Sequence, residues 1–165
     1  MASGKSSLGK KIAKKLDRKF IDLDKEIELF EQTTINEIFD QKGEDYFRRI
    51  ESEILGKTID NNPENIVLAL GGGTFFSKEN IAILKENGSV VYLFLELKNI
   101  LGRLKVDKEN RPLVKNLEEE KLKEKISKLF KTRESFYEQA HLKVDACKSK
   151  SKLVEEVILF IENQK

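Results

Sequence analysis

Two short runs of uninterrupted apolar residues, at 66–70 (IVLAL) and 90–95 (VVYLFL), lie in the middle of the chain. A strand with one face in water alternates polar and apolar residues, whereas a strand covered on both faces does not. Segments with helical spacing separate these runs from two further strand candidates, at 20–23 and 142–145. Strands that alternate with helices predict an α/β fold in which a parallel β-sheet is sandwiched by helices.

The predicted helices begin and end at local signals. Leu8, Ile12 and Leu16 recur at every fourth position and predict a helix that opens almost at the first residue. Thr34 and Glu37 have the spacing of a capping box, and the helix that they start should break near residue 43. Further helices are expected from about residue 25 and over 47–54, 77–87, 96–104, 117–139 and 152–161.

The length of 165 residues, of which 39% are hydrophobic, suits one core and a single domain over 1–165. Within it, residues 105–116 are charged and contain almost nothing apolar. A segment with few apolar contacts should be mobile, and its Arg111 could close over a phosphate. The alternative is a surface loop without a role.

Charge, cysteine content and the length of apolar runs argue against several classes of protein. The 31 Lys and Arg nearly balance the 29 Asp and Glu, and a net charge of +2 provides no electrostatic footprint for nucleic acid. One Cys rules out a disulfide framework and suits a reducing compartment. No apolar run approaches the roughly 18 residues that a membrane span needs. We therefore expect a cytoplasmic protein with no nucleic-acid or membrane partner.

The basic residues are unevenly chosen, because 25 of the 31 are Lys and 6 are Arg. Lys serves here as the general solvating cation, so each Arg is a candidate for planar, bidentate recognition of a carboxylate or phosphate. The neighbours Arg48 and Arg49 would project about 100° apart on a helix and cannot share a role. The alternatives are that Arg48 pairs with Glu51 on the helix surface and that Arg133 is a surface charge.

A candidate phosphate-binding turn, Ser3-Gly4-Lys5-Ser6-Ser7, leads directly into the first predicted helix. Such a turn aims unpaired backbone N–H groups at a phosphate, while the Lys reaches the outer phosphates and the first Ser after it reaches a magnesium ion. The full phosphate-binding loop also has a Gly five residues before the second one, preceded by a buried strand. The alternative is a polar tail that contains these residues by chance.

Two carboxylates, Asp22 and Asp24, stand at the end of the strand candidate at 20–23. Alternate residues of a strand share a face, so both carboxylates should point to one side. Such a pair is costly unless a metal ion or a hydrogen-bond donor faces it. The alternative is a solvated strand end that enters a turn.

Three consecutive glycines, 71–73, come directly after the apolar run at 66–70. Three glycines cost conformational entropy, so an ordinary turn explains them poorly. Close approach of the backbone to a ligand at the carboxyl edge of an α/β sheet explains them better.

Together these motifs resemble those of the shikimate kinase family, small P-loop kinases of the nucleoside-monophosphate-kinase type. The resemblance rests on Gly-Lys-Ser, Asp-x-Asp, Phe-Arg-x-x-Glu, Gly-Gly-Gly, Arg-Pro-Leu and an Arg before the final strand, and it covers essentially the whole chain in order. It implies a P-loop kinase fold with a mobile lid at about 105–116. It also implies Mg²⁺-dependent transfer of the γ-phosphoryl group of ATP to the 3-hydroxyl of shikimate, in chorismate and aromatic amino-acid biosynthesis, and we expect a monomer.

The resemblance also implies a role for each matched residue. The residues that would bind ATP are Ser3, Gly4, Lys5, Ser6, Ser7 and Arg111. Mg²⁺ would be held by Ser6 and Asp22. Asp24 would contact the shikimate hydroxyls and act as the catalytic base, with Lys5 and Arg111 as further catalytic residues. Shikimate would be bound by Asp24, Arg48, Gly72, Gly73 and Arg133, with the two arginines on its carboxylate.

The sequence departs from the family pattern before Gly4, where the first strand and the first Gly of the phosphate loop are not found. In this fold that strand lies in the middle of the sheet, so we expect low stability. A second basic lid residue could be Arg103 or Lys108, while His141 and Cys147 match nothing in the family pattern. Two other interpretations remain open, a non-catalytic protein that still binds shikimate or nucleotide and another small-molecule kinase such as a gluconate kinase.

Overall fold

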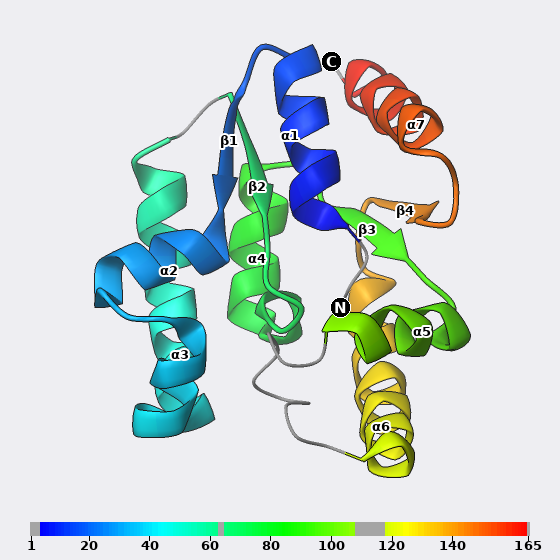
Figure 1. The fold of residues 1–165 in the computed structure, drawn as a ribbon. Helices are drawn as coiled ribbons and strands as arrows, with labels where there is room; N and C mark the ends of the chain where they lie inside the picture. The colour runs from blue at the N-terminus through cyan, green and yellow to red at the C-terminus, as the bar shows by residue number, and fades with distance from the viewer. Residues whose placement is uncertain (1–3, 63–64, 108–117, 165) are drawn as a thin grey trace.

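The computed structural model describes residues 4–62, 65–107 and 118–164. Its elements alternate between helices and strands along the chain, as predicted for an α/β fold (Figure 1). In order they are α1 (Lys5–Lys15), β1 (Lys19–Asp22), α2 (Leu23–Glu31), α3 (Ile35–Asp60), β2 (Ile66–Ala69), the 3₁₀ helix η1 (Thr74–Phe76), α4 (Lys78–Asn87), β3 (Val91–Phe94), α5 (Leu97–Asp107), α6 (Glu119–Tyr137), β4 (Leu142–Asp145) and α7 (Lys150–Glu162).

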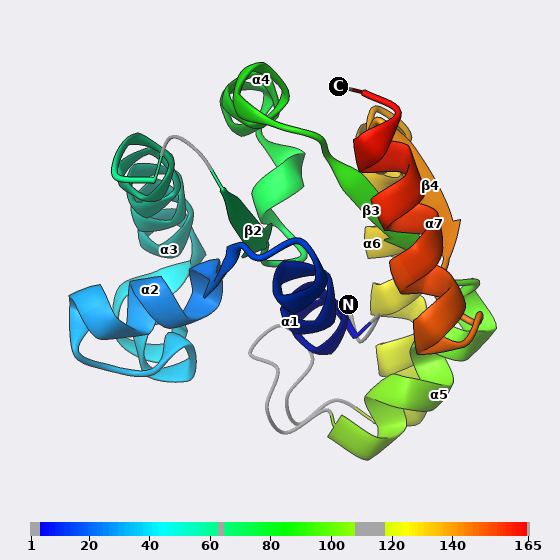
Figure 2. The same ribbon diagram turned by 90° about the horizontal axis from the view of Figure 1, so that it is seen from above.

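The strands form two parallel pairs. In the first pair β1 runs beside β2, with Asp22 opposite Ala69, and in the second β3 runs beside β4, with Phe94 opposite Asp145. Seen from above, α1 and α4 lie on opposite sides of the space between the two pairs (Figure 2). The predicted parallel pairing is therefore present, but the described strands form two sheets and not one continuous sheet.

A hollow of about 470 Å³ separates the two pairs. It is bordered by β2 and β3 and lined by apolar side chains from α1, α4 and α7, among them Leu8, Leu84 and Val157. In the described part of the chain no strand lies between β2 and β3. The prediction that these two strands are fully buried is therefore wrong, because three residues of β2 and all four of β3 are only half-buried along the hollow.

Three apolar clusters hold the helices. One joins α2, α3 and α4 around Leu23, Ile27 and Leu55, each of which has no exposed surface. A second packs α1 and α7 onto β4, and a third joins α5 to α6. In the described part of the chain no helix is long and apolar enough to cross a membrane.

The long helix α3 consists of two helical pieces, as the sequence predicts. It begins with the predicted capping box, in which the Thr34 side chain accepts from the backbone N–H of Glu37 and the Glu37 carboxylate accepts from that of Thr34. At Gly43 the backbone has φ 81° and ψ 175°, a region that is open almost only to glycine. The kink at Gly43 sets the direction of the second piece, which carries Arg48 and Glu51.

Two predicted boundaries shift. The strand candidate at 20–23 ends at Asp22, so Asp24 lies in the first turn of α2 and not on the strand. Of the predicted lid at 105–116, residues 105–107 belong to α5. The rest of that segment, with Lys108 and Arg111, lies outside the described residues.

We predict opposite effects for the same substitution at two glycines of α3. Gly43→Ala should lower the free energy of unfolding by about 1–3 kcal/mol, because alanine is strained at this backbone conformation. Gly56→Ala should raise it by about 0.5–1 kcal/mol, because Gly56 is helical and a Cβ there would meet no atom within 4 Å. Urea unfolding of both variants measures the difference, and stabilisation by Gly43→Ala would show that α3 is not kinked.

Candidate active site

The candidate residues gather where β1 and β2 end. We call residues 71–73, the three glycines that follow β2, the glycine loop. Because β1 and β2 are parallel and Asp22 pairs with Ala69, Asp22 and the glycine loop lie at the same edge of this strand pair. The amino end of α1, the first turn of α2, the second piece of α3 and the last turns of α6 contribute the remaining side chains.

The start of α1 has the form of a phosphate-binding turn. Gly4 precedes the helix with φ 85° and ψ 24°, a left-handed conformation that favours glycine, and no side chain caps the helix there. The first N–H groups of such a helix can bind an anion. The hydroxyl of Ser7 accepts a hydrogen bond from Lys150 of α7 at 2.9 Å. Ser3, which the sequence placed in the same turn, lies outside the described residues.

The two residues predicted to hold Mg²⁺ lie in direct contact, because the Ser6 hydroxyl donates to Asp22 Oδ2 at 2.6 Å. A hydroxyl and a carboxylate are hard oxygen ligands that suit Mg²⁺. No cluster of three or more His, Cys, Asp and Glu able to hold a metal occurs among the residues that the structure describes. In proteins Mg²⁺ is commonly bound through one or two protein oxygens together with substrate phosphates and water, and the Ser6 and Asp22 pair fits this pattern.

The carboxyl group of Asp24 has a raised pKa. Its burial, followed by the repulsion of Asp22, raises its pKa from the ordinary 3.8 to about 6, although Lys5 acts in the opposite direction. A carboxylate with such a pKa is a stronger base than an exposed aspartate and is still largely ionised at pH 7. The chemistry of the group therefore suits proton transfer from a substrate hydroxyl.

The glycine loop is shaped by side chains of the protein itself. A Cβ on Gly71 would lie 2.9 Å from both Asp24 Oδ1 and Glu51 Oε1, and a Cβ on Gly73 would overlap the guanidinium of Arg48. The sequence predicts that the glycines allow a ligand to approach the backbone closely. The structure shows that side chains of the protein also approach it closely, and these contacts require glycine as well. Glycine at 71 lets the carboxylates of Asp24 and Glu51 lie directly against the backbone, and glycine at 73 does the same for the guanidinium of Arg48.

Arg48 and Arg49 have different surroundings, in agreement with the prediction that they cannot share a role. Arg48 Nη1 donates to Glu51 Oε2 at 2.7 Å and lies against the glycine loop. Arg49 is exposed, with its guanidinium 5.1 Å from the ring centre of Tyr46.

Glu51 is a residue whose importance sequence reasoning missed, because the pair with Arg48 was weighed as a contact on the helix surface. It is 1% exposed, and its second oxygen accepts from Thr74 Oγ1 at 2.6 Å. A signal was present in the sequence, since Glu51 falls among the apolar positions Phe47, Ile50 and Ile54 of one helix face. A charged residue on such a face is buried only with a partner.

Arg133 is buried rather than a surface charge. It is 7% exposed, its Nη1 donates to the carbonyl oxygen of Gly72 at 3.0 Å, and its guanidinium lies 5.7 Å from the ring centre of Phe76. Within the described part of the chain no carboxylate forms an ion pair with it. A buried cation without a counter-charge is costly, and a bound anion would supply the missing partner.

Tyr137, which the sequence did not single out, shares the carbonyl of Gly72 with Arg133. Its hydroxyl donates to that oxygen, and its ring stacks on Tyr92 at 4.9 Å between centres. Burial raises the pKa of Tyr137, which keeps the hydroxyl protonated as a donor. One signal in the sequence is its spacing, since Tyr137 lies four residues after Arg133 and so on the same face of α6.

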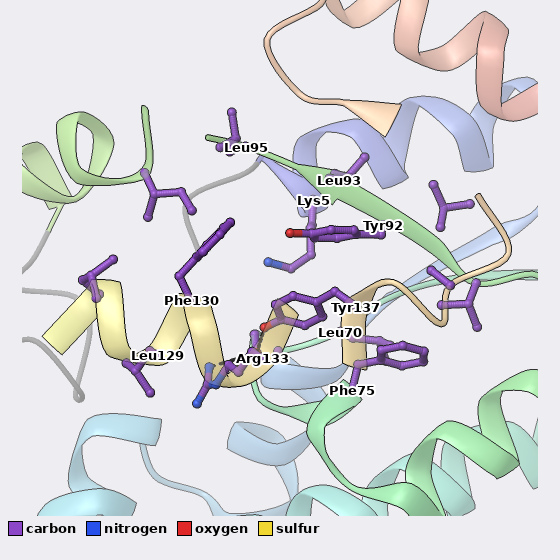
Figure 3. A pocket seen from close by; sticks show the side chains of 17 residues that line it. Lys5, Leu70, Phe75, Tyr92, Leu93, Leu95, Leu129, Phe130, Arg133 and Tyr137 are labelled. Carbon is purple, nitrogen blue, oxygen red and sulfur yellow. Dashed lines mark hydrogen bonds between the residues drawn. The ribbon is translucent and has the colours of Figure 1, made fainter. Parts of the chain in front are cut away.

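A cavity of about 110 Å³ adjoins the glycine loop, and Lys5, Tyr92, Arg133 and Tyr137 reach into the space around it (Figure 3). Of the two other residues noted in the sequence, His141 has a contact that supports the fold, because its Nδ1 atom accepts from the backbone N–H of Val90. Cys147 is an exposed thiol.

Comparison with known proteins agrees with the motifs. The family model described as shikimate kinase matches residues 1–162. The shikimate kinase of Sulfurihydrogenibium sp. is 41% identical over 165 residues, which cover 99% of this chain and 95% of that protein. The shikimate kinase of Persephonella marina is 38% identical over 159 residues, which cover 96% of this chain and 92% of that protein.

Solved structures show the same similarity. The shikimate kinase from Acinetobacter baumannii in complex with shikimate has a TM-score of 0.90 at 34% identity and covers 100% of this chain and 90% of its own. The shikimate kinase from Aquifex aeolicus has a TM-score of 0.83 at 34% identity, over 99% of this chain and 93% of its own. The fold is thus that of the P-loop kinases, and the chain belongs to the shikimate kinase family.

Proposed function

We propose that this chain transfers the γ-phosphoryl group of ATP to the 3-hydroxyl of shikimate and releases ADP and shikimate 3-phosphate. Membership of a family of ATP-dependent kinases supports the reaction and argues against a gluconate kinase. We place the reaction in the cytoplasm, where ATP is available. The lid role of Arg111 stays a prediction from the sequence.

The buried guanidinium of Arg133 is the observation that carries the substrate assignment. Arg133 donates to Gly72, and Arg48 lies against Gly73, so two cations contact neighbouring residues of one loop. A planar carboxylate is the ligand that a guanidinium binds with two parallel hydrogen bonds. A ring acid held there by its carboxylate would be oriented relative to the loop and to Asp24.

In the proposed mechanism, the chain positions the two substrates and manages charge. Asp24 accepts the proton of the attacking hydroxyl as its oxygen bonds to the γ-phosphorus and the bond to the β-γ bridging oxygen breaks. Lys5 and the first N–H groups of α1 would stabilise the negative charge of the phosphates. Ser6 and Asp22 would hold Mg²⁺, which supplies further charge neutralisation when it is bound.

The first test is turnover itself. ADP formation by the purified chain should require both shikimate and Mg²⁺ and should stop when the metal is removed with EDTA. Binding of shikimate without any turnover would favour the alternative of a non-catalytic binding protein.

We predict that Asp24→Asn lowers turnover by about 10²–10⁴-fold, the usual contribution of a general base. Asparagine preserves the shape of the side chain but does not accept the proton, so ATP binding should change little. Steady-state kinetics and a separate nucleotide titration measure the two effects. Turnover at the wild-type rate in Asp24→Asn would mean that another group is the base.

We also predict that Asp24→Asn is more stable to unfolding than the wild type at neutral pH. The unfolded chain loses the Asp24 proton near pH 3.8 and the folded chain near pH 6, so stability falls as pH rises through this range. At pH 7 the ionised group costs on the order of 2–3 kcal/mol, which Asp24→Asn should recover. Thermal unfolding at pH 7 and pH 4, without nucleotide or metal, should show the gain only at pH 7. An equal gain at both values would contradict the raised pKa.

We predict that Arg133→Lys weakens shikimate binding by about 1.5–3 kcal/mol, because lysine keeps the charge but loses the bidentate contact. ATP affinity should be unaffected. The matched control is Arg49→Lys, since Arg49 is exposed and away from the glycine loop. Calorimetric titration of shikimate into each variant measures the effect, and an unchanged affinity in Arg133→Lys would remove the main support for the substrate assignment.

A further inference from the structure

The guanidinium of Arg48 donates hydrogen bonds to two carboxylates that differ greatly in solvent exposure. Glu51 accepts from Nη1 at 2.7 Å and is buried, whereas Glu44 accepts from Nε at 3.3 Å and from Nη2 at 3.1 Å. The Glu44 side chain is 48% exposed, against 1% for that of Glu51. Three nitrogens of Arg48 are therefore already in use.

A substrate carboxylate on Arg48 needs a pair of N–H groups along one edge of the guanidinium. The edge formed by Nε and Nη2 is spanned by a single oxygen of Glu44. Glu51 holds Nη1, and the group lies against Gly73. Arg133, by contrast, has no carboxylate partner in the described part of the chain, so an anion that binds it displaces no carboxylate.

The two partners differ in how easily they can leave Arg48. Release of Glu51 would strand a buried carboxylate, which is costly. Release of Glu44 needs only a side-chain rotation into water, because an exposed ion pair contributes little stability. Glu44 also follows the kink at Gly43 directly, at the start of the second helical piece of α3.

We propose that Glu44 is a competing internal carboxylate, which occupies the edge of Arg48 that the substrate carboxylate takes and gives it up when the substrate binds. This inference rests on the proposed function. A ligand needs an anionic group of its own, such as a carboxylate, to replace Glu44 on Arg48, so a neutral ligand of similar shape gains nothing from the exchange. Glu44 thereby lowers the affinity for shikimate, which must displace it, and leaves the affinity for a neutral ligand of similar shape unchanged.

The test is calorimetric titration of two ligands into two proteins. Shikimate should bind Glu44→Gln about two- to fivefold more tightly than the wild type, the range that release of one exposed ion pair allows. The carboxamide of shikimate, which is neutral, should bind both proteins equally. Glu53→Gln is the matched control, because Glu53 forms an exposed pair with Lys57 on the same helix, and it should not change the affinity for shikimate.

Weaker or unchanged shikimate binding in Glu44→Gln would overturn the inference, because Glu44 would then orient Arg48 or play no part. An equal gain for the carboxamide would overturn it as well. Glu44→Ala is a second variant that should show the same gain, so the result does not depend on properties of glutamine. Failure of the wild type to bind shikimate would instead overturn the proposed function, and this inference with it.

Discussion

The candidate site depends on the buried carboxylate of Glu51. A buried carboxylate is costly unless it is paired and hydrogen-bonded, and its two oxygens are taken by Arg48 at 2.7 Å and Thr74 at 2.6 Å. Because Arg48 lies on α3 and Thr74 begins η1, the carboxylate ties the second piece of α3 to the segment that follows the glycine loop. This tie holds the guanidinium of Arg48 against Gly73 and Glu51 itself close to Gly71.

The site concentrates groups that are unfavourable for folding and favourable for binding. Arg133 is buried with no counter-charge among the described residues, and burial together with the repulsion of Asp22 raises the pKa of Asp24 to about 6. Each arrangement costs stability in the free protein. A bound anion would neutralise the charge of Arg133, and Asp24 would accept the proton of a substrate hydroxyl. The charges that lower the stability of the free protein therefore suit the proposed reaction.

The elements of the fold were predictable because each depends on signals within a few residues. The capping box of Thr34 and Glu37 and the break at Gly43 both follow from local hydrogen bonds and backbone conformation. The degree to which the strands are buried was not predictable from such local signals. Residues 66–70 and 90–95 have the composition of fully buried strands, yet β2 and β3 are half-buried because both border the hollow. Burial depends on what packs against a strand, which no local pattern contains.

The sequence by itself determined the chemical inventory of the protein: a Gly-Lys-Ser turn before a helix, two aspartates after a strand, three glycines and a few arginines, in an order typical of one kinase family. Only the tertiary structure decided that Glu51 is buried and that Arg133 and Tyr137 share the carbonyl of Gly72. Arg133 and Gly72 are 61 residues apart, and Glu51 and Thr74 are 23 apart. Burial and hydrogen-bond partners belong to two distant segments at once, so they exist only after α3 and α6 have packed around the loop that follows β2.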